Sequence, residues 1–405
     1  MGKKSIFRQV VLAVLGMLLF SCSVLSPAPK ITPLITDLPR TPTMNSDQAQ
    51  TKAAFQSTPT PFPSPTAWNV VTPTLTLRSI PAELNTTNPL TGLEVENPDL
   101  LWERPIMVKL ANWPQSLRPA NQITHADIVF EYYIGHQMNH LLALFYGGDA
   151  VAAGPLAPGR VVDARLARRY QANLIAASAP VTVEGVFEQT LLDRVFYRGY
   201  APCPGICTET QAQGGNTVVD TAAMRAYINA TETDNAIERL PELNFKKRIE
   251  TWDEIALRVS YMYADFSVMD WRYDKIYGGY QLWQDFQSED GTYSLSQTFD
   301  RDTNQPLLFE NVLILLADYI EYNSSFYDID FRENDPHQAA IFLRDGKLTH
   351  GTWYAPGINQ PLQFFDSRGN PYYLKPGQTW ITFASTTSRM ELVEDGIWDI
   401  TFVPN

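Results

Sequence analysis

The segment that most clearly predicts a strand reads Ala126-Asp127-Ile128-Val129-Phe130-Glu131-Tyr132-Tyr133. Side chains two residues apart on a strand project to the same face, so Asp127, Val129 and Glu131 share one face. The two carboxylates would be about 13 Å apart, which is too far for a hydrolytic pair. Exposed carboxylates on a half-buried strand are ordinarily solvated or ion-paired. The functional alternative is a ligand-binding polar groove lined by Asn112, Arg118, Asp127, Glu131 and Arg160.

Around this strand, segments with the two-residue hydrophobic period of strands alternate with segments that have the 3.6-residue period of helices. Strands are expected over 105–110 and 141–146, and helices from about Asp163, over 183–195 and over 220–229. Such a mixture predicts a mixed α/β N-terminal subdomain covering residues 88–245.

The composition changes after about residue 250. Short β-rich segments alternate with turn signals such as Gly278-Gly279 and Pro376-Gly377. This pattern predicts a mainly antiparallel β C-terminal subdomain over 246–405 and an α+β fold class for the whole chain. The strands expected here are 258–262, 268–273, 280–286, 312–317, 340–343, 351–354 and 379–384.

The first 22 residues predict an export signal. Three basic residues precede an apolar run over 10–20, which is shorter than the roughly 20 residues that cross a bilayer. The following Leu19-Phe20-Ser21-Cys22 resembles the bacterial lipobox, although Phe20 is bulkier than the residue usual there. The resemblance implies lipid on Cys22 and a location on the extracytoplasmic face of the cell membrane. An uncleaved membrane anchor is the alternative, which the short apolar run disfavours.

Residues 23–87 are dominated by Pro, Thr and Ser. Such a segment has too few large apolar residues to form a core, so it is expected to be an extended, disordered tether. Residues 1–81 carry seven Lys/Arg and two Asp, a net charge of +5. Because the whole chain carries −13, residues 82–405 carry −18. A body this acidic repels phosphates, which argues against nucleic acid as a partner.

Three cysteines are present. If Cys22 is lipidated, Cys203 and Cys207 remain, and an even, closely spaced remainder outside the cytoplasm indicates a disulfide. Pro204 and Gly205 supply a turn between them. A redox pair or a zinc site is the alternative, although a redox pair usually has two intervening residues and zinc would need two further ligands.

Signatures of cofactor binding and catalysis are missing from the sequence. The five histidines show no metal-binding spacing, and we find neither a phosphate-binding loop nor a dinucleotide fingerprint. Glu184 and Glu188 stand one helical turn apart and form the best candidate pair for a glycosidase, although such pairs are commonplace on solvated helices. Trp271 and Tyr273 share a strand face, where core packing is favoured over a sugar-stacking platform.

An ordered series of motifs resembles a known family. It includes Asn88-Pro89-Leu90-Thr91-Gly92, Trp271-Arg272-Tyr273-Asp274 and Leu374-Lys375-Pro376-Gly377-Gln378-Thr379-Trp380. Together these resemble the YerB, or DUF3048, family of bacterial lipoproteins over about residues 88–385. The family has no established activity, so the resemblance implies architecture and location more than chemistry.

The chain departs from the family at two positions. A Gly-Pro-Val-Arg-Ser-Ala/Gly-Arg stretch appears as residues 154–160, where only Arg160 remains of two arginines. A Thr-Arg pair appears as Asn139-His140. If those arginines hold an anionic group in relatives, a bidentate contact is missing here.

The expected function is that of a membrane-anchored binding or scaffolding protein of the cell envelope. The expected partners are the membrane, through the lipid anchor, and a cell-wall polymer or an envelope protein. The alternative is an envelope hydrolase acting on glycan or peptide material.

Overall fold

The computed structural model describes residues 86–208, 216–231, 234–250, 254–288, 290–323, 326–332 and 337–404. The expected signal segment, Cys22 and nearly all of the tether lie outside these residues. Within them, no helix is both long and apolar enough to cross a bilayer.

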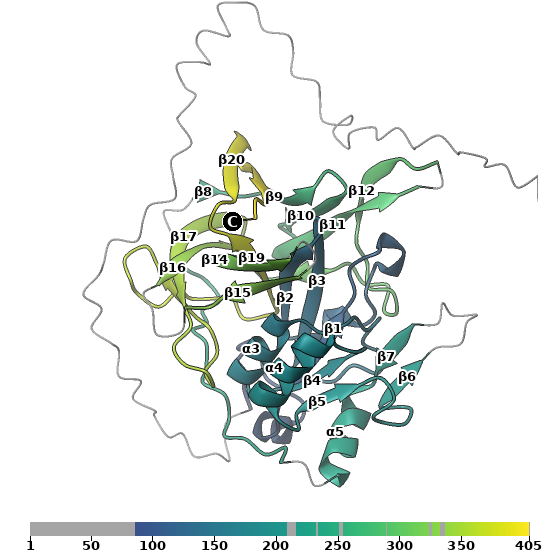
Figure 1. Ribbon diagram of the computed structural model, residues 1–405. Coiled ribbons are helices and arrows are strands. Elements are labelled where there is room, and N and C mark those ends of the chain that lie inside the picture. Colours follow the sequence, from purple (N-terminus) through teal and green to yellow (C-terminus); the bar gives the residue numbers. More distant parts are fainter. Residues whose placement is uncertain are drawn as a thin grey trace, which may run out of the picture.

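A large mixed sheet occupies the centre of the molecule (Figure 1). Its strands within the described residues are β1 (Ile106–Leu110), β2 (Ile128–Gly135), β3 (Met138–Phe145), β4 (Asn173–Ala176), β5 (Val195–Tyr197), β8 (Glu254–Ile255), β14 (Asn311–Asn323), β15 (Phe326–Asp330), β16 (Gln338–Arg344), β17 (Lys347–Tyr354), β18 (Gln363–Asp366) and β19 (Thr379–Ser385). The main path runs β18-β17-β16-β14-β19-β2-β3-β1-β4-β5, with β15 beside β14 and β8 beside β17.

Strands from both halves of the chain meet in this sheet. β2 pairs with β19 in parallel, with Ile128 opposite Thr379 and Glu131 opposite Thr382. On its other edge β2 pairs antiparallel with β3. Every residue of β2 is buried, so the expectation of a half-solvated strand is wrong. The reason is tertiary, because β19 covers the edge of β2 and further layers cover its two faces.

A second sheet covers one face of the first. Within the described residues it contains β9 (Arg258–Ala264), β10 (Ser267–Asp274), β11 (Gly279–Gln287), β12 (Tyr293–Gln297), β13 (Leu308–Phe309), β20 (Arg389–Glu394) and β21 (Ile397–Thr401). Its order is β12-β11-β10-β9-β21-β20, with β13 beside β11.

Aromatic side chains fill the space between the sheets. Trp271 on β10 lies 5.1 Å from Trp380 on β19, measured between ring centroids, and both rings are almost fully buried. Fully burying a large apolar side chain contributes roughly 1.5–3 kcal/mol, so this contact helps to hold the two sheets together. Trp271 therefore packs in the core, as the strand pattern favoured.

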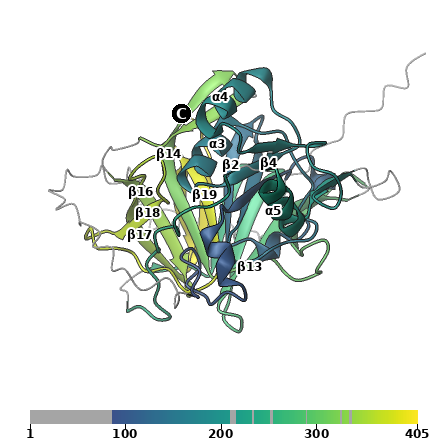
Figure 2. The same ribbon diagram turned by 90° about the horizontal axis from the view of Figure 1, so that it is seen from below.

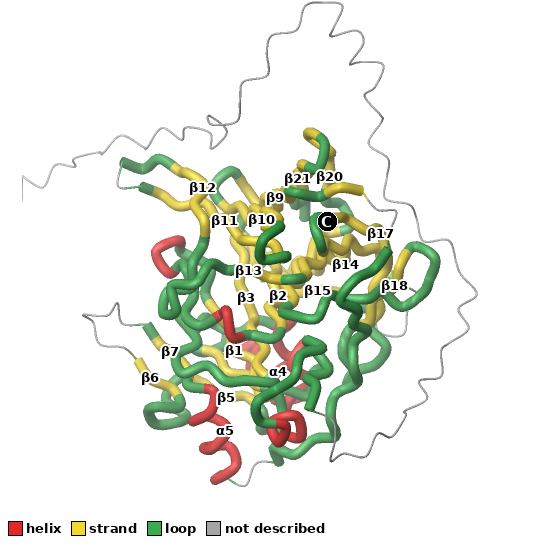
Figure 3. The backbone as a smooth tube through the Cα atoms, turned by 180° about the vertical axis from the view of Figure 1, so that it is seen from behind, coloured by secondary structure: helices red, strands yellow, loops and turns green. Residues whose placement is uncertain are grey.

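Helices cover the other face of the large sheet. They are α3 (Val161–Arg169), α4 (Val181–Leu191) and α5 (Thr221–Ala230), and Figure 2 shows α3 and α4 lying over the central strands. Tyr170, at the end of α3, packs on Phe130 of β2 with ring centroids 5.4 Å apart. Seen from behind, α4 and α5 lie at the end of the molecule opposite β9 and β12 (Figure 3). A two-stranded sheet of β6 (Ile206–Thr208) and β7 (Thr217–Val219), together with the short 3-10 helices η3 (Pro98–Trp102), η4 (Gln115–Leu117) and η5 (Ile123–His125), completes the described elements.

The chain therefore combines strands and helices in an α+β fold in which strands predominate. All the strands expected from the sequence are present, although several boundaries differ. The helix expected over 183–195 ends at Leu191, because Val195 enters β5 beside β4. The helix expected from about Asp163 is α3, which ends at Arg169, and Leu174 belongs to β4 although it continues the helical spacing of Leu166 and Tyr170. In the C-terminal half, β14–β19 and β9–β21 are parallel pairs among otherwise antiparallel ones.

Candidate functional site

Glu131 lies at the centre of a buried polar network between the two sheets. Its carboxylate accepts hydrogen bonds from Trp380 Nε1 at 2.7 Å, Thr382 Oγ1 at 2.9 Å and Asn139 Nδ2 at 2.6 Å. Burial raises the pKa of this carboxyl, and the three donors oppose that shift. Since the group is completely buried and its partners are internal, Glu131 joins the two halves of the chain and is closed to solvent.

The same network reaches Asn112 and Arg118. Asn112 Nδ2 donates to Asn139 Oδ1 at 2.8 Å, and Gln284 Nε2 on β11 donates to Asn112 Oδ1 at 3.1 Å. Arg118 Nη1 lies 3.1 Å from the Asp285 carboxylate, and both side chains are fully buried. Burial lowers the pKa of Arg118, and Asp285 partly offsets this effect. Three of the five expected groove residues are thus brought together, in the interior between the sheets.

Asp127 has a separate set of partners at the start of β2. It accepts hydrogen bonds from Asn88 Nδ2 at 2.8 Å and from the backbone amides of Tyr146 at 2.6 Å and Gly147 at 3.0 Å. Burial raises the pKa of Asp127 to about 6, and the two amides and Arg225 act against this shift. Asp127, which precedes β2, is therefore hydrogen-bonded to Tyr146 and Gly147, which directly follow β3.

Arg160 belongs to a third cluster, on the helix-covered face of the sheet. It precedes α3, and its backbone amide donates to Asp163 in the first helical turn at 2.6 Å. Asp163 also accepts a hydrogen bond from Tyr132, whose hydroxyl accepts one from Lys109. The Lys109 ammonium lies 3.6 Å from the Asp163 carboxylate, and both side chains are fully buried. The five residues expected to line one groove are therefore distributed over three places.

His140 and Ala157 also lie at the third cluster. His140 lies opposite Tyr132 in the β2–β3 ladder, and the Ala157 amide donates to the Lys109 carbonyl at 2.9 Å. Burial lowers the pKa of His140 well below its usual range, and the charges of Lys109 and Arg160 add to this effect. The pKa of Lys109 falls to about 7, mainly through burial. The neutral ring of His140 and the methyl group of Ala157 therefore add no further cation beside Lys109.

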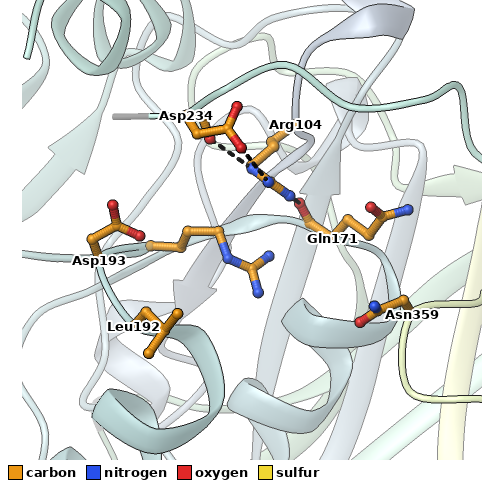
Figure 4. Close-up of a pocket in the computed structure, with 7 residues that line it drawn as sticks. Arg104, Gln171, Leu192, Asp193, Asp234 and Asn359 are labelled. Atoms are coloured by element: carbon orange, nitrogen blue, oxygen red, sulfur yellow. Dashed lines mark hydrogen bonds and ion pairs between the residues drawn. The ribbon is translucent and has the colours of Figure 1, made fainter. Parts of the chain in front are cut away.

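Two solvent-open cavities lie outside these buried clusters, between the ends of α3 and α4 and the loop at 357–360. The first has a volume of about 290 Å³ and is lined by Arg104, Gln171, Leu192, Asp193, Arg194, Asp234 and Asn359 (Figure 4). The second, of about 270 Å³, is lined by Arg165, Arg168, Val186, Thr190 and Ile358. Residues of α3 and α4 line the second cavity, residues just after these helices line the first, and Ile358 and Asn359 are consecutive in the loop. Arg168 of the second cavity is also close enough to Arg194 of the first for its charge to lower the pKa of Arg194, so we call the two cavities together the arginine groove.

The way α3 and α4 end shapes the arginine groove. The Gln171 amide donates to the Arg168 carbonyl and the Ala172 amide donates to the Ala167 carbonyl, a Schellman arrangement that satisfies the last carbonyls of α3. Gln171 adopts φ +52° there, a left-handed conformation that glycine usually takes. Leu192, directly after α4, has φ +56° and keeps 76% of its surface exposed. Both residues therefore reverse the chain at the edge of the groove.

Glu184 and Glu188 lie on α4 and line neither of the two cavities described above. Glu184 is half-buried, Glu188 is exposed, and neither lines the arginine groove. They project from α4 about 200° away from Val186 and Thr190, which face the second cavity. Within the described residues no group of three or more His, Cys, Asp or Glu side chains could hold a metal ion.

Cys203 and Cys207 form a disulfide, with their Cα atoms 5.0 Å apart. The bridge closes the turn that leads into β6, whose partner β7 precedes α5. The disulfide that the spacing indicates is therefore present.

The chain belongs to a family of proteins of unknown function, DUF3048. Residues 90–233 match its N-terminal domain and residues 257–381 its C-terminal domain. The family resemblance seen in the sequence is thereby confirmed. A search of curated proteins finds no match.

A solved structure has the same fold. It is described as the crystal structure of YerB protein from Bacillus subtilis, a structural genomics target. At 20% sequence identity the TM-score is 0.58, and the match covers 74% of this chain and 97% of that one. This likeness supports the fold and carries no information about a ligand.

Several residues of these sites give no local signal in the sequence. Gln284 and Asp285 reach Asn112 and Arg118 from more than 160 residues away along the chain. Lys109 lies within a strand that the sequence did predict, but its burial depends on α3 packing above it. Arg165 and Arg168 stand three apart on a predicted helix and could have been recognised as one basic face.

Proposed function

We propose that this chain is a lipoprotein anchored through Cys22 to the extracytoplasmic face of the cell membrane. The N-terminal basic residues, the short apolar run and the lipobox-like Leu19-Phe20-Ser21-Cys22 support this proposal. The Cys203–Cys207 disulfide agrees with it, because disulfides persist in oxidising compartments outside the cytoplasm. In this proposal residues 23–87 are the tether, and residues 88–245 and 246–405 are an α/β and a mainly β subdomain of one folded body.

We further propose that the body binds or scaffolds a partner of the cell envelope, either a wall polymer or a protein. The observation that carries this proposal is where the ionisable groups lie. The buried carboxylates at 127, 131, 163 and 285 already have internal partners, whereas the solvent-open arginine groove presents cations. Two carboxylates, Asp193 and Asp234, also line the groove, but Asp234 lies 3.5 Å from Arg104 and Asp193 is exposed. A glycosidase would need two carboxyls with opposed environments on either side of a bound sugar, so this pair favours a binding role.

The anchor is tested by intact mass spectrometry of the protein purified from its own membranes. The expected mature chain begins at Cys22 and carries a diacylglyceryl group. A Cys22→Ser variant should lose this modification and should no longer partition into detergent with the membrane fraction. An unmodified Cys22, or a leader that is still attached, contradicts the proposal.

The envelope partner is tested by chemical cross-linking in intact cells, followed by purification of the protein. The expected result is a reproducible cross-linked species that contains wall material or an envelope protein. Hydrolysis of wall glycan or peptide by the purified protein would instead establish the enzymatic alternative.

A further inference from the structure

We propose that the arginine groove binds the C-terminal carboxylate of a short peptide that ends in a small apolar residue. This proposal rests on the binding role above and names the chemistry of its ligand. It follows from the charge, the apolar surface and the hydrogen-bonding groups of the groove.

Two of the four groove arginines already have carboxylate partners. Arg104 lies 3.5 Å from Asp234, and Figure 4 marks this ion pair between two lining residues of the first cavity. Arg165 lies 2.9 Å from Asp328, a buried carboxylate beneath the groove. These pairs neutralise each other and add little net charge to the groove.

The other two arginines have no carboxylate partner within the described residues. The Arg168 side chain, which lines the second cavity, makes no hydrogen bond or ion pair there. Arg194 donates only to backbone carbonyls, those of Leu191 and Ala172. Burial lowers the pKa of Arg194 to about 10, and the charge of Arg104 adds to this effect. A bound anion would offset this repulsion, and a guanidinium fork suits a planar carboxylate.

The surroundings favour one negative charge over several. The groove is formed by the C-terminal ends of α3 and α4, where backbone carbonyls contribute a partial negative charge. Asp193, which is exposed, also lines it. The body as a whole repels polyanions, since residues 82–405 carry −18. A carboxylate monoanion therefore fits better than a phosphate dianion or a polyanionic chain.

The remaining lining groups suit a peptide. Val186 and Ile358 give the second cavity an apolar wall beside Arg168. In the first cavity the side-chain amides of Gln171 and Asn359 make no hydrogen bond within the described residues, and such amides complement peptide N–H and C=O groups. Each cavity lies just below the usual size range of about 300–1,000 Å³ for ligand pockets, so a ligand of about two residues is expected.

The test is calorimetric titration of the purified full-length protein with N-acetyl-alanyl-alanine. The matched control ligand is the same dipeptide with a C-terminal amide, which lacks the carboxylate. The matched protein variants are Arg168→Ala in the groove and Arg389→Ala on exposed β20 of the second sheet. Arg168→Lys tests whether the planar fork matters, because lysine keeps the charge and loses the bidentate geometry.

The expected result is saturable binding of the acid, with at least tenfold weaker binding of the amide. Arg168→Ala should weaken binding of the acid about tenfold, and Arg389→Ala should leave it unchanged. Inorganic phosphate provides a further comparison. If phosphate binds as tightly as the dipeptide acid and responds equally to Arg168→Ala, the peptide assignment is overturned.

Lack of saturable binding by the acid, in a protein whose thermal unfolding is normal, overturns the site itself. That outcome leaves the lipid anchor and the cross-linked partner to be judged by their own experiments. Failure of the anchor, conversely, does not alter the titration.

Discussion

Asp127 offers a quantitative test of the buried interior. Its pKa is raised to about 6 in the folded protein, against 3.8 for the unperturbed side chain. The folded protein therefore holds a proton on Asp127 at pH values where the unfolded chain has lost it. Stability from this group is fully present below about pH 4 and is lost as the pH rises through 6. The shift corresponds to about 3 kcal/mol, since each pKa unit is worth about 1.4 kcal/mol.

The change to make is Asp127→Asn, which removes the titration and keeps the shape of the side chain. Its amide nitrogen would face a donor, because Asn88 Nδ2 and two backbone amides all point at this carboxyl. A constant loss is therefore expected in addition to the part that varies with pH. The informative quantity is the wild-type free energy of unfolding minus that of the variant, followed across pH.

Urea unfolding at several pH values between 4 and 7.5 measures this difference. It should be about 2.5 kcal/mol larger at pH 4 than at pH 7.5, because most of the 3 kcal/mol is already present at pH 4 and titration of all distant groups cancels between the two proteins. Asp99→Asn, which removes an exposed carboxylate, controls for the loss of one charge. A difference that stays flat, or that grows as the pH rises, would refute the assignment of Asp127 as a carboxyl that burial makes hard to ionise.

Three further predictions concern other residues. In Lys109→Met the pH dependence should change in the alkaline range, because the folded pKa of Lys109 is about 7 and the unfolded value is 10.5. Wild type should gain about 2 kcal/mol between pH 7 and pH 9 that the variant does not gain, which urea unfolding at the two pH values measures. Glu131→Gln should lower the free energy of unfolding by about 2 kcal/mol at pH 7, because its amide nitrogen would face one of three donors. The control is Glu391→Gln, which changes an exposed side chain. Equal unfolding midpoints for the two variants would contradict the buried network. Leu192→Gly should raise the melting temperature, because glycine adopts φ +56° without strain and about 1 kcal/mol of backbone strain is removed. A lower melting temperature in differential scanning calorimetry would show that the contacts of Leu192 outweigh its backbone strain.

The sequence predicted the local elements well, because their signals lie within a few residues. Alternation in 126–133 and the helical spacing after Asp163 are both visible in the structure as β2 and α3. The main error lies at the end of an element, where the helix predicted over 183–195 runs on into β5. Val195 becomes part of a strand because it pairs with β4. The residues around Val195 do not show in their own pattern that this partner strand will lie beside them.

The candidate site was predicted only in part. Asn112, Arg118 and Glu131 do belong to one polar network, but burial between two sheets makes it an internal one. The choice of those residues assumed an exposed strand face, and the covering layer comes from residues 258 onward. The arginine groove was missed because its walls are two helix ends and a loop that lies almost 170 residues further along the chain.

By itself, the sequence determined the family, the acidic body and most of the strands and helices. These depend on composition, on ordered motifs and on periodicities that operate over a few residues. The tertiary structure decided which polar groups are buried and which are open to solvent. That outcome depends on β19 pairing with β2 and on the second sheet covering Glu131, and a contact between residues 250 positions apart has no counterpart in any local pattern.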